Sequence, residues 1–567
     1  MPKIVAVVPV DPKRSRLGLP SRCHAPLAGR TVLAHTVSRL CRVPKLSSVV
    51  LLHGEGPDPL QTVNGAKFTK PLSSCAGDAG WTDAQQGRRR SARKWSLGSW
   101  RGGLGGMTCF DEMLPAAPLL EAVRSHDADA ALIVGGDWPL VDPELCRRLI
   151  EQHLDSPEAY MMTFSQAPPG LGGIVVGRKL LEDLTAQTAG SIGGLMAYHP
   201  SRPQADPIGR DLCVQIDASV RSCLQRFVCD TPRSADMINL LAEQLGDRFD
   251  EADAATVTAL ATKNAEQLET SAPHLPRLVT LELTPQRDAR LDGPLVPQGH
   301  VRFDRAPMEL GLALRIVRQL GAEGDIALTL GGLGDALQHP HWQQIVEAAH
   351  EAGVLGIAVE TDLLVEPAQA LKLLDLPIDV VSVRLNADTD RTYRVAMAPG
   401  TNGEGPPFAT VVGHLETLMN RCAARRREGS DRIAPWIVTR LAKTTLTMGD
   451  MESFFDRWTH FAGHAVIEAA TPGRGRDGDL MPDLSTVPMS PPLRTGCRQL
   501  EQRMTILSNG RVAQCDQDWL GEGTGGNAAE ADLSTIWKDT QNLRLAHAEG
   551  RWNEIGLCGG CRQWHRA

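Results

Sequence analysis

Long apolar runs are absent from this sequence, and that absence limits what the protein can be. No stretch approaches the roughly 20 apolar residues that a membrane-spanning helix needs, so we expect no membrane segment. The opening residues MPKIVAVVPV lack the apolar core and the cleavage site of a secretion signal, and they predict a first buried strand instead. We therefore expect a cytoplasmic protein.

An excess of positive charge is also missing. The formal net charge is -8 at pH 7, which argues against a surface that binds nucleic acid generally. Aromatic residues make up only 4% of the chain, but 42% of the residues are hydrophobic and 22% are charged, as in a soluble globular protein. A chain of 567 residues is too long for one core, so we expect three or four domains.

A disulfide framework is not the expected use of the 13 cysteines, because a chain of this size without a secretion signal more plausibly keeps thiols and metal ligands. The last four are Cys497, Cys515, Cys558 and Cys561. The final pair, in LCGGC, suits either a metal centre or a redox disulfide. Four thiolates form a complete tetrahedral set for Zn²⁺ or for an iron–sulfur cluster, and their spacing alone does not choose between the two.

Two alternating series of strand and helix patterns precede these cysteines. In residues 1–250, β-branched runs such as KIVAVVPV and DAALIVGGD alternate with helical patterns, which predicts a parallel or mixed α/β sheet. A terminal helix and a linker follow at 251–273, with a boundary near Ser271. Six further strand patterns in 274–475 predict an open doubly wound sheet or a partial TIM-type barrel. The tail at 476–567 has a core too small to fold well alone, so we expect a cross-link such as a metal centre to stabilise it.

A segment rich in arginine and glycine interrupts the first series. Residues 85–112, QQGRRRSARKWSLGSWRGGLGGMTCFDE, show no periodicity and predict a long loop or flap. Two roles are open for this segment. It closes over phosphate groups, with arginine on the charge and Trp95 or Trp100 on a base, or it packs against the second domain.

The tail resembles the SPASM domain, an auxiliary-cluster module found behind many radical SAM cores. The resemblance runs from Cys497 onward, through CRQLEQRMTILSNGRVAQCDQDWLG, GGN, LSTIWKD, LRLAHAEGRW and LCGGC. It implies one [4Fe-4S] cluster that is fully ligated by the four tail cysteines. A zinc ion, or thiols that ligate nothing, are the alternatives. The pair Asn509-Gly510 separates two β-type runs, which predicts a hairpin that presents Cys515 after its second strand.

The middle region resembles a radical SAM core in LTLGGLGDALQHP, AVETDLL and VSVRLNADTD. That core depends on a CxxxCxxC loop after its first strand, whose thiolates bind a cluster that chelates S-adenosylmethionine. Here the loop reads LELTPQRDARLDGPL and has Gln286, Arg290 and Gly293 at those positions. None of the three can be a thiolate. The resemblance therefore implies a retained scaffold that does not cleave S-adenosylmethionine.

A glycine-rich turn in the same region matches the family's Gly-Gly-Glu-Pro segment. The matching residues are Gly331, Gly332, Gly334 and Asp335. Such a turn forms either a backbone nest for a small anion or a tight connection between a strand and a helix.

The N-terminal region resembles the nucleotide-sugar nucleotidyltransferases, particularly the cytidylyltransferases that activate acidic sugars. The resemblance lies in VVPVDPKRSRLGLPSRCHAPLAGRTVLAHTVSRL and DADAALIVGGDWPLVDPELCRRLIEQH. It implies a Rossmann-type sheet, a loop that wraps a triphosphate, and carboxylates that bind Mg²⁺. The residues that match the loop are Arg14, Ser15 and Arg16, the first metal ligand is Asp137, and the second is Asp236 or Asp230. Cations and a metal neutralise the phosphate charge that develops during in-line attack.

This region departs from the family in two places. The loop has no Gly-x-Gly cradle, and Cys23-His24-Ala25-Pro26 stands where a phosphate-binding lysine is expected. A neutral histidine is a poor substitute for a permanent cation. We therefore expect a nucleotide or sugar nucleotide to bind with Mg²⁺ but to turn over slowly or not at all. Asp137 has a second possible role, as a cap of the turn that follows its strand.

The three resemblances together are those of the spiro-SPASM fusion proteins. They imply a nucleotidyltransferase-like domain, a radical SAM-like barrel without its catalytic cluster, and a SPASM domain. Two alternative functions are open. One is an active nucleotidyltransferase whose C-terminal modules sense redox state or recruit a partner. The other is an electron-transfer or maturation partner of an intact radical SAM enzyme.

Overall fold

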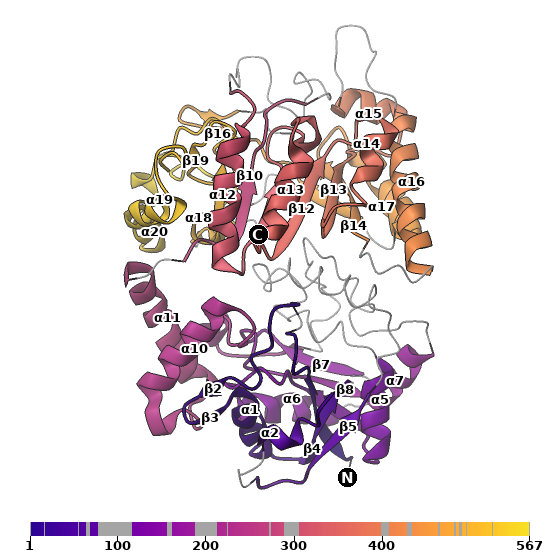
Figure 1. Ribbon diagram of the computed structural model, residues 1–567, viewed down its shortest axis with the longest axis vertical. Helices are drawn as coiled ribbons and strands as arrows, with labels where there is room; N and C mark the ends of the chain where they lie inside the picture. Colours follow the sequence, from indigo (N-terminus) through magenta and orange to yellow (C-terminus); the bar gives the residue numbers. More distant parts are fainter. Residues whose placement is uncertain are drawn as a thin grey trace. The chain divides into compact units, whose positions relative to one another are not determined.

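The computed structural model divides into two compact units, Met1–Ser271 and Ala272–Ala567 (Figure 1). It describes residues 2–15, 17–54, 56–63, 68–77, 116–155, 161–186, 213–223, 225–271, 274–287, 305–397, 408–427, 434–462, 465–480, 484–486, 490–494, 496–523 and 525–565. The predicted flap at 85–112 lies outside these residues, as do Arg16, Arg290 and Gly293. No helix of the described part of the chain is long and apolar enough to cross a membrane.

A seven-stranded sheet in the order β5-β4-β1-β6-β8-β7-β9 organises the first unit. Its strands are β1 (Ile4–Val10), β4 (Leu46–His53), β5 (Leu72–Ala76), β6 (Ala130–Ile133), β7 (Met162–Ser165), β8 (Ile174–Gly177) and β9 (Cys213–Val214). Neighbours among β5, β4, β1 and β6 are parallel, whereas β8 is antiparallel to both β6 and β7. The α/β sheet expected for this region is confirmed in its mixed form.

The strand order reverses at β1. From β1 the chain builds outward through β4 and β5, and it then returns to place β6 on the other side of β1. Open α/β sheets bind ligands at such a switch point, outside the carboxyl ends of the strands. The loops at this point are the ones that carry Arg14 and Asp137.

Helices cover both faces of this sheet. They are α1 (Val32–Cys41), α2 (Leu60–Val63), α5 (Ala116–Ser125), α6 (Pro143–Asp155), α7 (Arg178–Thr185), α9 (Ala218–Ser222), α10 (Pro232–Leu245) and α11 (Ala254–Ser271), with the small ribbon β2 (Pro26–Leu27) and β3 (Arg30–Thr31) before α1. Alternate residues of β1 enter different cores: Ile4 packs in the core that contains α1 and α6 side chains, and Val5 packs in the core that contains α5 and α7 side chains. A strand buried on both faces explains the continuous apolar run at the start of the sequence.

The second unit contains an eight-stranded sheet in the order β15-β14-β13-β12-β11-β10-β18-β19. Its strands are β10 (Leu278–Leu281), β11 (Ala327–Leu330), β12 (Gly356–Thr361), β13 (Val380–Arg384), β14 (Trp436–Lys443), β15 (Val466–Ala469), β18 (Arg503–Ile506) and β19 (Val512–Ala513). Strands β10 to β15 are parallel and lie in chain order. A doubly wound sheet would reverse this order, so that alternative is excluded. Closure into a partial barrel stays a prediction.

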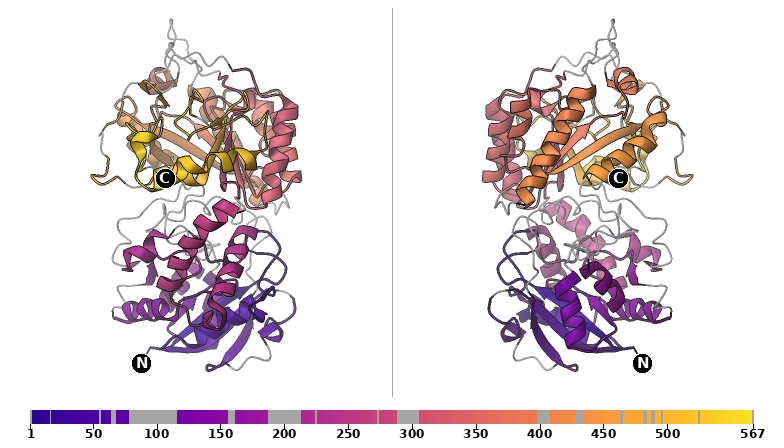
Figure 2. Two further views of the ribbon diagram at one scale, coloured as in Figure 1. Left: turned by 90° about the vertical axis from the view of Figure 1, so that its left-hand side faces the viewer. Right: turned by 90° about the vertical axis from the view of Figure 1, so that its right-hand side faces the viewer.

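The two faces of this sheet differ in chemistry. Leu281, Leu330 and Val359 belong to an apolar core with side chains of α12 (Leu310–Glu323), α13 (Trp342–Glu351), α16 (Phe408–Arg427) and α17 (Met451–Ala462). Figures 1 and 2 show these helices beside the sheet. Along each strand, the residues that alternate with these apolar ones face the opposite side of the sheet. This second face also carries buried apolar residues such as Ala358, Val380 and Val438. Its polar residues are Thr280, Glu282, Thr329, Glu360, Ser382, Arg384, Arg440 and Glu468. Crossovers of one hand between strands in sequential order place their helices on a single face.

The tail adds two strands to this sheet. Strand β18 pairs with β10 in parallel, and β19 pairs with β18 in antiparallel. Between them Gly510 has φ +83, a left-handed conformation that favours glycine. The hairpin predicted at Asn509-Gly510 is therefore confirmed, and Cys515 follows its second strand after one intervening residue, Gln514.

Candidate functional site

The four tail cysteines come from three separate segments of the second unit. Cys497 is the N-cap of α18 (Arg498–Gln502), and Cys515 follows β19. Cys558 and Cys561 lie in consecutive turns after the short helix η6 (Trp552–Glu554), where the Cys561 N–H donates to the Cys558 carbonyl oxygen at 3.1 Å. None of the four is in a disulfide.

Electrostatic interactions couple the four thiols to one another. Burial raises the pKa of Cys558 to about 12, and the negative charges of Cys561 and Cys497 contribute to the shift. Burial also raises the pKa of Cys515 well above its ordinary value, with contributions from Asp516 and then from Cys558 and Cys497. Thiolates gathered in this way repel one another, so a bound metal centre would stabilise them.

The cysteine sulfur atoms do not converge on a single point. In the parts of the chain that the structure describes, no three His, Cys, Asp or Glu side chains are close enough together to hold one metal ion. The four thiols are thus electrostatically coupled within one region of the second unit, without meeting at one point.

Hydrogen-bond donors surround this set. The side-chain amide of Gln514 donates from Nε2 to the Cys558 sulfur at 3.2 Å, and the backbone N–H of Gln563 donates to the Cys561 sulfur at 3.3 Å. The Arg494 guanidinium donates to the carbonyl oxygen of Cys558 at 2.8 Å, and its positive charge lowers the pKa of that thiol against the effect of burial. Thiols with N–H donors on their sulfurs are the ligand environment that iron–sulfur clusters use.

Polar contacts join the Cys515 segment to the carboxyl end of β10. Arg305 donates to both carboxylate oxygens of Glu282 at 3.0 Å and to the carbonyl oxygen of Trp519 at 2.7 Å. The indole N–H of Trp519 donates in turn to the Asp516 carbonyl oxygen at 3.1 Å. These contacts fix the chain beside Cys515 to the sheet.

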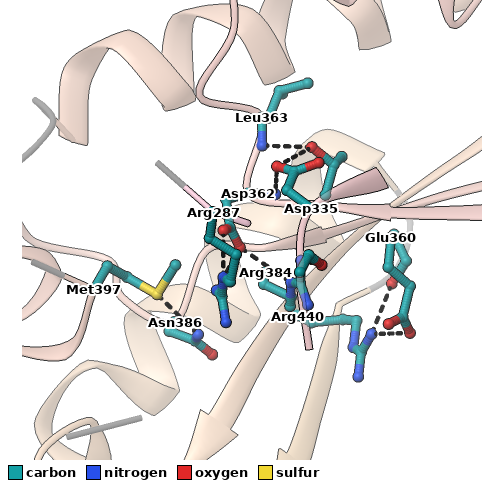
Figure 3. A network of polar contacts seen from close by, with 12 residues as sticks. Arg287, Asp335, Glu360, Asp362, Leu363, Arg384, Asn386, Met397 and Arg440 are labelled. Carbon is teal, nitrogen blue, oxygen red and sulfur yellow. Dashed lines mark hydrogen bonds and ion pairs between the residues drawn. The ribbon is translucent and has the colours of Figure 1, made fainter. Parts of the chain in front are cut away.

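The described start of the loop after β10, residues 282–287, is held by a buried network of charges (Figure 3). The carbonyl oxygen of Gln286 accepts from the Asp335 N–H at 2.8 Å. The next residue, Arg287, makes a two-point contact with Asp362 at 2.7 Å, and Arg384 donates to the same carboxylate at 3.0 Å. The two arginines hold the pKa of Asp362 below its ordinary value although burial acts in the opposite direction.

The glycine-rich turn after β11 directs its carbonyl oxygens at the guanidinium group of Arg384. Arg384 donates to the carbonyl oxygens of Gly332 at 2.9 Å and Gly334 at 2.8 Å. A Cβ on Gly334 would lie 1.8 Å from the Thr284 carbonyl oxygen, and Gly332 has φ +101, so both positions require glycine. Gly331 is also tightly packed, because a Cβ there would lie 2.7 Å from a Glu360 carboxylate oxygen. Anion binding at this turn stays a prediction.

Asp335 is buried at the end of this turn. Its carboxylate accepts from the Leu337 N–H and the Asp362 N–H, at 2.9 and 2.8 Å, and from the Thr361 hydroxyl at 2.9 Å. Burial raises its pKa to about 6, and the charge of Asp362 adds to the effect. These contacts make Asp335 a link between β11 and β12.

A second charge network lies on the polar face of the sheet. Arg440 on β14 donates from Nη1 to Glu360 on β12 at 2.6 Å and from Nε to Glu468 on β15 at 2.7 Å. Its Nη1 also lies 3.3 Å from the Ser382 hydroxyl. One arginine thereby joins side chains of four neighbouring strands.

In the first unit, the loop after β1 is closed by its own backbone. The Asp11 carboxylate accepts from the N–H groups of Lys13 at 2.8 Å and Arg14 at 3.0 Å. The Ser15 N–H donates to the Leu19 carbonyl oxygen at 2.7 Å, and the Ser15 hydroxyl accepts from Leu17. Ser15 is therefore occupied within the loop, while Arg14 is exposed.

The expected metal carboxylates of the first unit lie around Cys229. The Cys229 N–H donates to the Asp137 carbonyl oxygen at 2.8 Å. Burial raises the pKa of Cys229 to about 12, and the charges of Asp137, Asp230 and Asp236 all contribute to the shift. Asp230 is engaged by Arg226 through two hydrogen bonds of 2.7 and 2.6 Å, whereas Asp236 is exposed on α10.

Comparison with known proteins places one family in the tail. Residues 497–562 match SPASM, an iron–sulfur cluster-binding domain. An uncharacterized protein from Treponema pallidum (strain Nichols) is 31% identical over 116 residues, which are 20% of this chain and 31% of that protein. The chain thus spans less than a third of the length of that curated relative.

Solved structures give weaker similarities. A cytidylyltransferase from Leptospira borgpetersenii serovar Hardjo-bovis (strain JB197) is 15% identical, with a TM-score of 0.34 over 47% of this chain and 96% of its own. Streptococcus suis SuiB bound to S-adenosylmethionine is 14% identical, with a TM-score of 0.40 over 62% of this chain and 88% of its own. At these values, neither similarity establishes a shared function.

The network at Asp362 gives a testable expectation for stability. Asp362→Asn removes the carboxylate that Arg287 and Arg384 share in a buried site, so we expect the free energy of unfolding to fall by about 3 to 5 kcal/mol. Asp375→Asn is the matched control, because Asp375 pairs with Arg425 at the surface and should cost under about 1 kcal/mol. Urea denaturation of the full-length variants measures both, and equal losses would show that the buried network does not stabilise the unit.

Proposed function

We propose that this protein binds one [4Fe-4S] cluster through Cys497, Cys515, Cys558 and Cys561. The observation that carries the proposal is the presence of four coupled thiols, free of disulfides, in residues that match an iron–sulfur cluster-binding domain. When bound, such a cluster supplies one-electron transfer. With four protein thiolates as ligands, no iron is left open for a substrate.

Residues around the thiols support this role. Arg494 holds the backbone of Cys558, and Gln514 holds its sulfur. The contacts from Glu282 through Arg305 to Trp519 keep the Cys515 segment against the sheet. A cluster bound here would be held by segments that these contacts join to the sheet and to one another.

The parallel sheet of the second unit serves, in this proposal, as a scaffold that does not cleave S-adenosylmethionine. Gln286 stands at the first of the three cysteine positions of a CxxxCxxC loop. Arg287 beside it makes two hydrogen bonds to the carboxylate of Asp362. A loop without thiolates has no means of holding the iron that reductive cleavage requires. The fully ligated tail cluster then favours a role as an electron-transfer or maturation partner of an intact radical SAM enzyme.

The first unit is proposed to bind a nucleotide or a sugar nucleotide together with Mg²⁺. Asp137 and Arg14 lie in the two loops at the switch point of its sheet, where ligands of such sheets bind. The second metal carboxylate is Asp236, which is exposed on α10, or Asp230, which Arg226 engages. The missing lysine and glycine cradle weaken stabilisation of the transition state more than they weaken binding.

Metal analysis tests the cluster. Anaerobically prepared protein should be brown and carry about four irons and four sulfides per chain, since a cubane holds four of each. Cys515→Ala should lose the colour and most of the iron. Cys75→Ala, which changes a half-buried cysteine of the first unit, should retain both. Stoichiometric zinc without sulfide would contradict the assignment.

The missing thiolates predict a chemical result for the second unit. Dithionite-reduced protein with its tail cluster loaded should convert no S-adenosylmethionine to 5′-deoxyadenosine, because no iron is open to chelate it. Chromatography of the reaction mixture against a no-enzyme control measures this. Product above the control would show that a cluster with an open iron forms elsewhere in the chain.

Calorimetry tests the first unit. We expect weak binding of at least one nucleoside triphosphate or of a CDP- or UDP-sugar, strengthened by Mg²⁺, with Asp137→Ala removing the Mg²⁺ effect. Asp183→Ala is the control, since Asp183 is exposed on α7 and pairs with Lys179. Pyrophosphate release should be slow, because each lost charged contact costs roughly 2 to 4 kcal/mol of transition-state stabilisation.

Two results would overturn this part of the proposal. No binding at millimolar ligand would leave the unit without a nucleotide role. Rapid pyrophosphate release from CTP and a sugar acid would instead make the protein an active nucleotidyltransferase whose C-terminal modules sense redox state or recruit a partner.

A further inference from the structure

Gln514 is a side chain that reaches directly to one of the four tail sulfurs. It follows β19 and precedes Cys515, but its amide Nε2 lies 3.2 Å from the sulfur of Cys558, which is 44 residues away in sequence. Only 9% of Gln514 is exposed. The contact therefore joins two of the segments that supply the cluster ligands, at the one tail cysteine of the four that is buried.

The surrounding backbone fixes the position of this amide. The Gln514 N–H donates to the Asp518 carboxylate at 3.0 Å, and the same carboxylate accepts from the N–H groups of Glu522 and Gly523. A Cβ on Gly523 would lie 2.4 Å from the Gln514 Cβ, and a Cβ on Gly556 would lie 3.3 Å from the Gln514 Oε1. The side chain thus lies against backbone on two sides and has little freedom to turn away.

The chemistry of the two groups defines the direction of the hydrogen bond. A thiolate accepts hydrogen bonds and cannot donate, so the NH₂ group of the amide is the end that pairs with the sulfur. Hydrogen bonds to the sulfurs are one of the factors that set the reduction potential of an iron–sulfur cluster. An N–H donor stabilises the more negative, reduced cluster more than the oxidised cluster.

From this geometry we infer that Gln514 is a positioning residue for the cluster, which raises its reduction potential by donating to the sulfur of Cys558. This inference rests on the proposed cluster ligation. Arg494 acts on the same ligand from its backbone side, through the Cys558 carbonyl oxygen at 2.8 Å. The two donors thus act on Cys558 from its sulfur and from its backbone.

An anaerobic redox titration of the full-length, cluster-loaded protein tests the inference. One electron from dithionite, carried by mediators, reduces the cluster from the 2+ to the 1+ state, and the ratio of reduced to oxidised cluster is read by electron paramagnetic resonance at a fixed potential. Gln514→Leu should lower this ratio about fivefold, which is the effect of losing one hydrogen bond of about 1 kcal/mol. Gln514→Glu should lower it at least as much above neutral pH, because a carboxylate oxygen then faces the sulfur.

The chain offers a matched control in Gln563. This glutamine also supplies a donor to a tail sulfur, at 3.3 Å from Cys561, but the donor is its backbone N–H. Gln563→Leu keeps that N–H, so the ratio of reduced to oxidised cluster should not change. Iron and sulfide contents equal to those of the wild-type protein show that each variant carries the complete cluster.

The possible outcomes separate the inference from the proposed function. If the wild-type protein takes up no iron and sulfide, the cluster proposal fails, and the inference fails with it. If Gln514→Leu carries a full cluster with an unchanged ratio, only the inference is overturned. If neither Gln514 variant loads a cluster, the residue supports cluster binding and does not tune its potential, which also overturns the inference.

Discussion

The parallel pairing of β10 with β18 determines where the cysteine centre lies. Four consecutive register pairs join Leu278–Leu281 to Arg503–Ile506. Just beyond them, the buried carboxylate of Glu282 accepts from the Ser508 N–H, a contact between residues 226 positions apart. Through this pairing the tail becomes part of a large sheet, and the hairpin that follows β18 delivers Cys515 to a fixed place.

The same pairing gives the tail a stability that it could not reach with its own side chains. The apolar cluster next to the cysteines is small, with Ala546, Ile555 and Cys558 as its buried members. The sheet supplies a hydrophobic core that contains Met504 and Ile506 of β18, and β18 in turn covers an edge of β10 that would otherwise be open for pairing. A cluster joining Cys497, Cys515, Cys558 and Cys561 would add covalent links between the remaining tail segments.

Local patterns in the sequence predicted those features that depend on local physics. The rhythm of strands and helices predicted both sheets, and Asn509-Gly510 predicted the hairpin, because a type of turn is specified by the residues within it. The pairing of β18 with β10 carries no such signal, since neither segment identifies a distant partner. The contacts of Arg287 with Asp362 and of Arg226 with Asp230 were missed for the same reason, and so was the contact from Gln514 to Cys558. Only the cysteines and the order of motifs around them indicated the site in advance.

The proposed centre is one cluster, ligated by four thiolates and without an open iron. Mössbauer spectroscopy of protein loaded with ⁵⁷Fe is the decisive measurement, because the spectrum distinguishes irons by their ligands. We expect the signal of a single cubane with four thiolate ligands, and we expect S-adenosylmethionine to leave this signal unchanged. A second iron population that shifts when S-adenosylmethionine is added would show that the protein holds an iron open to substrate.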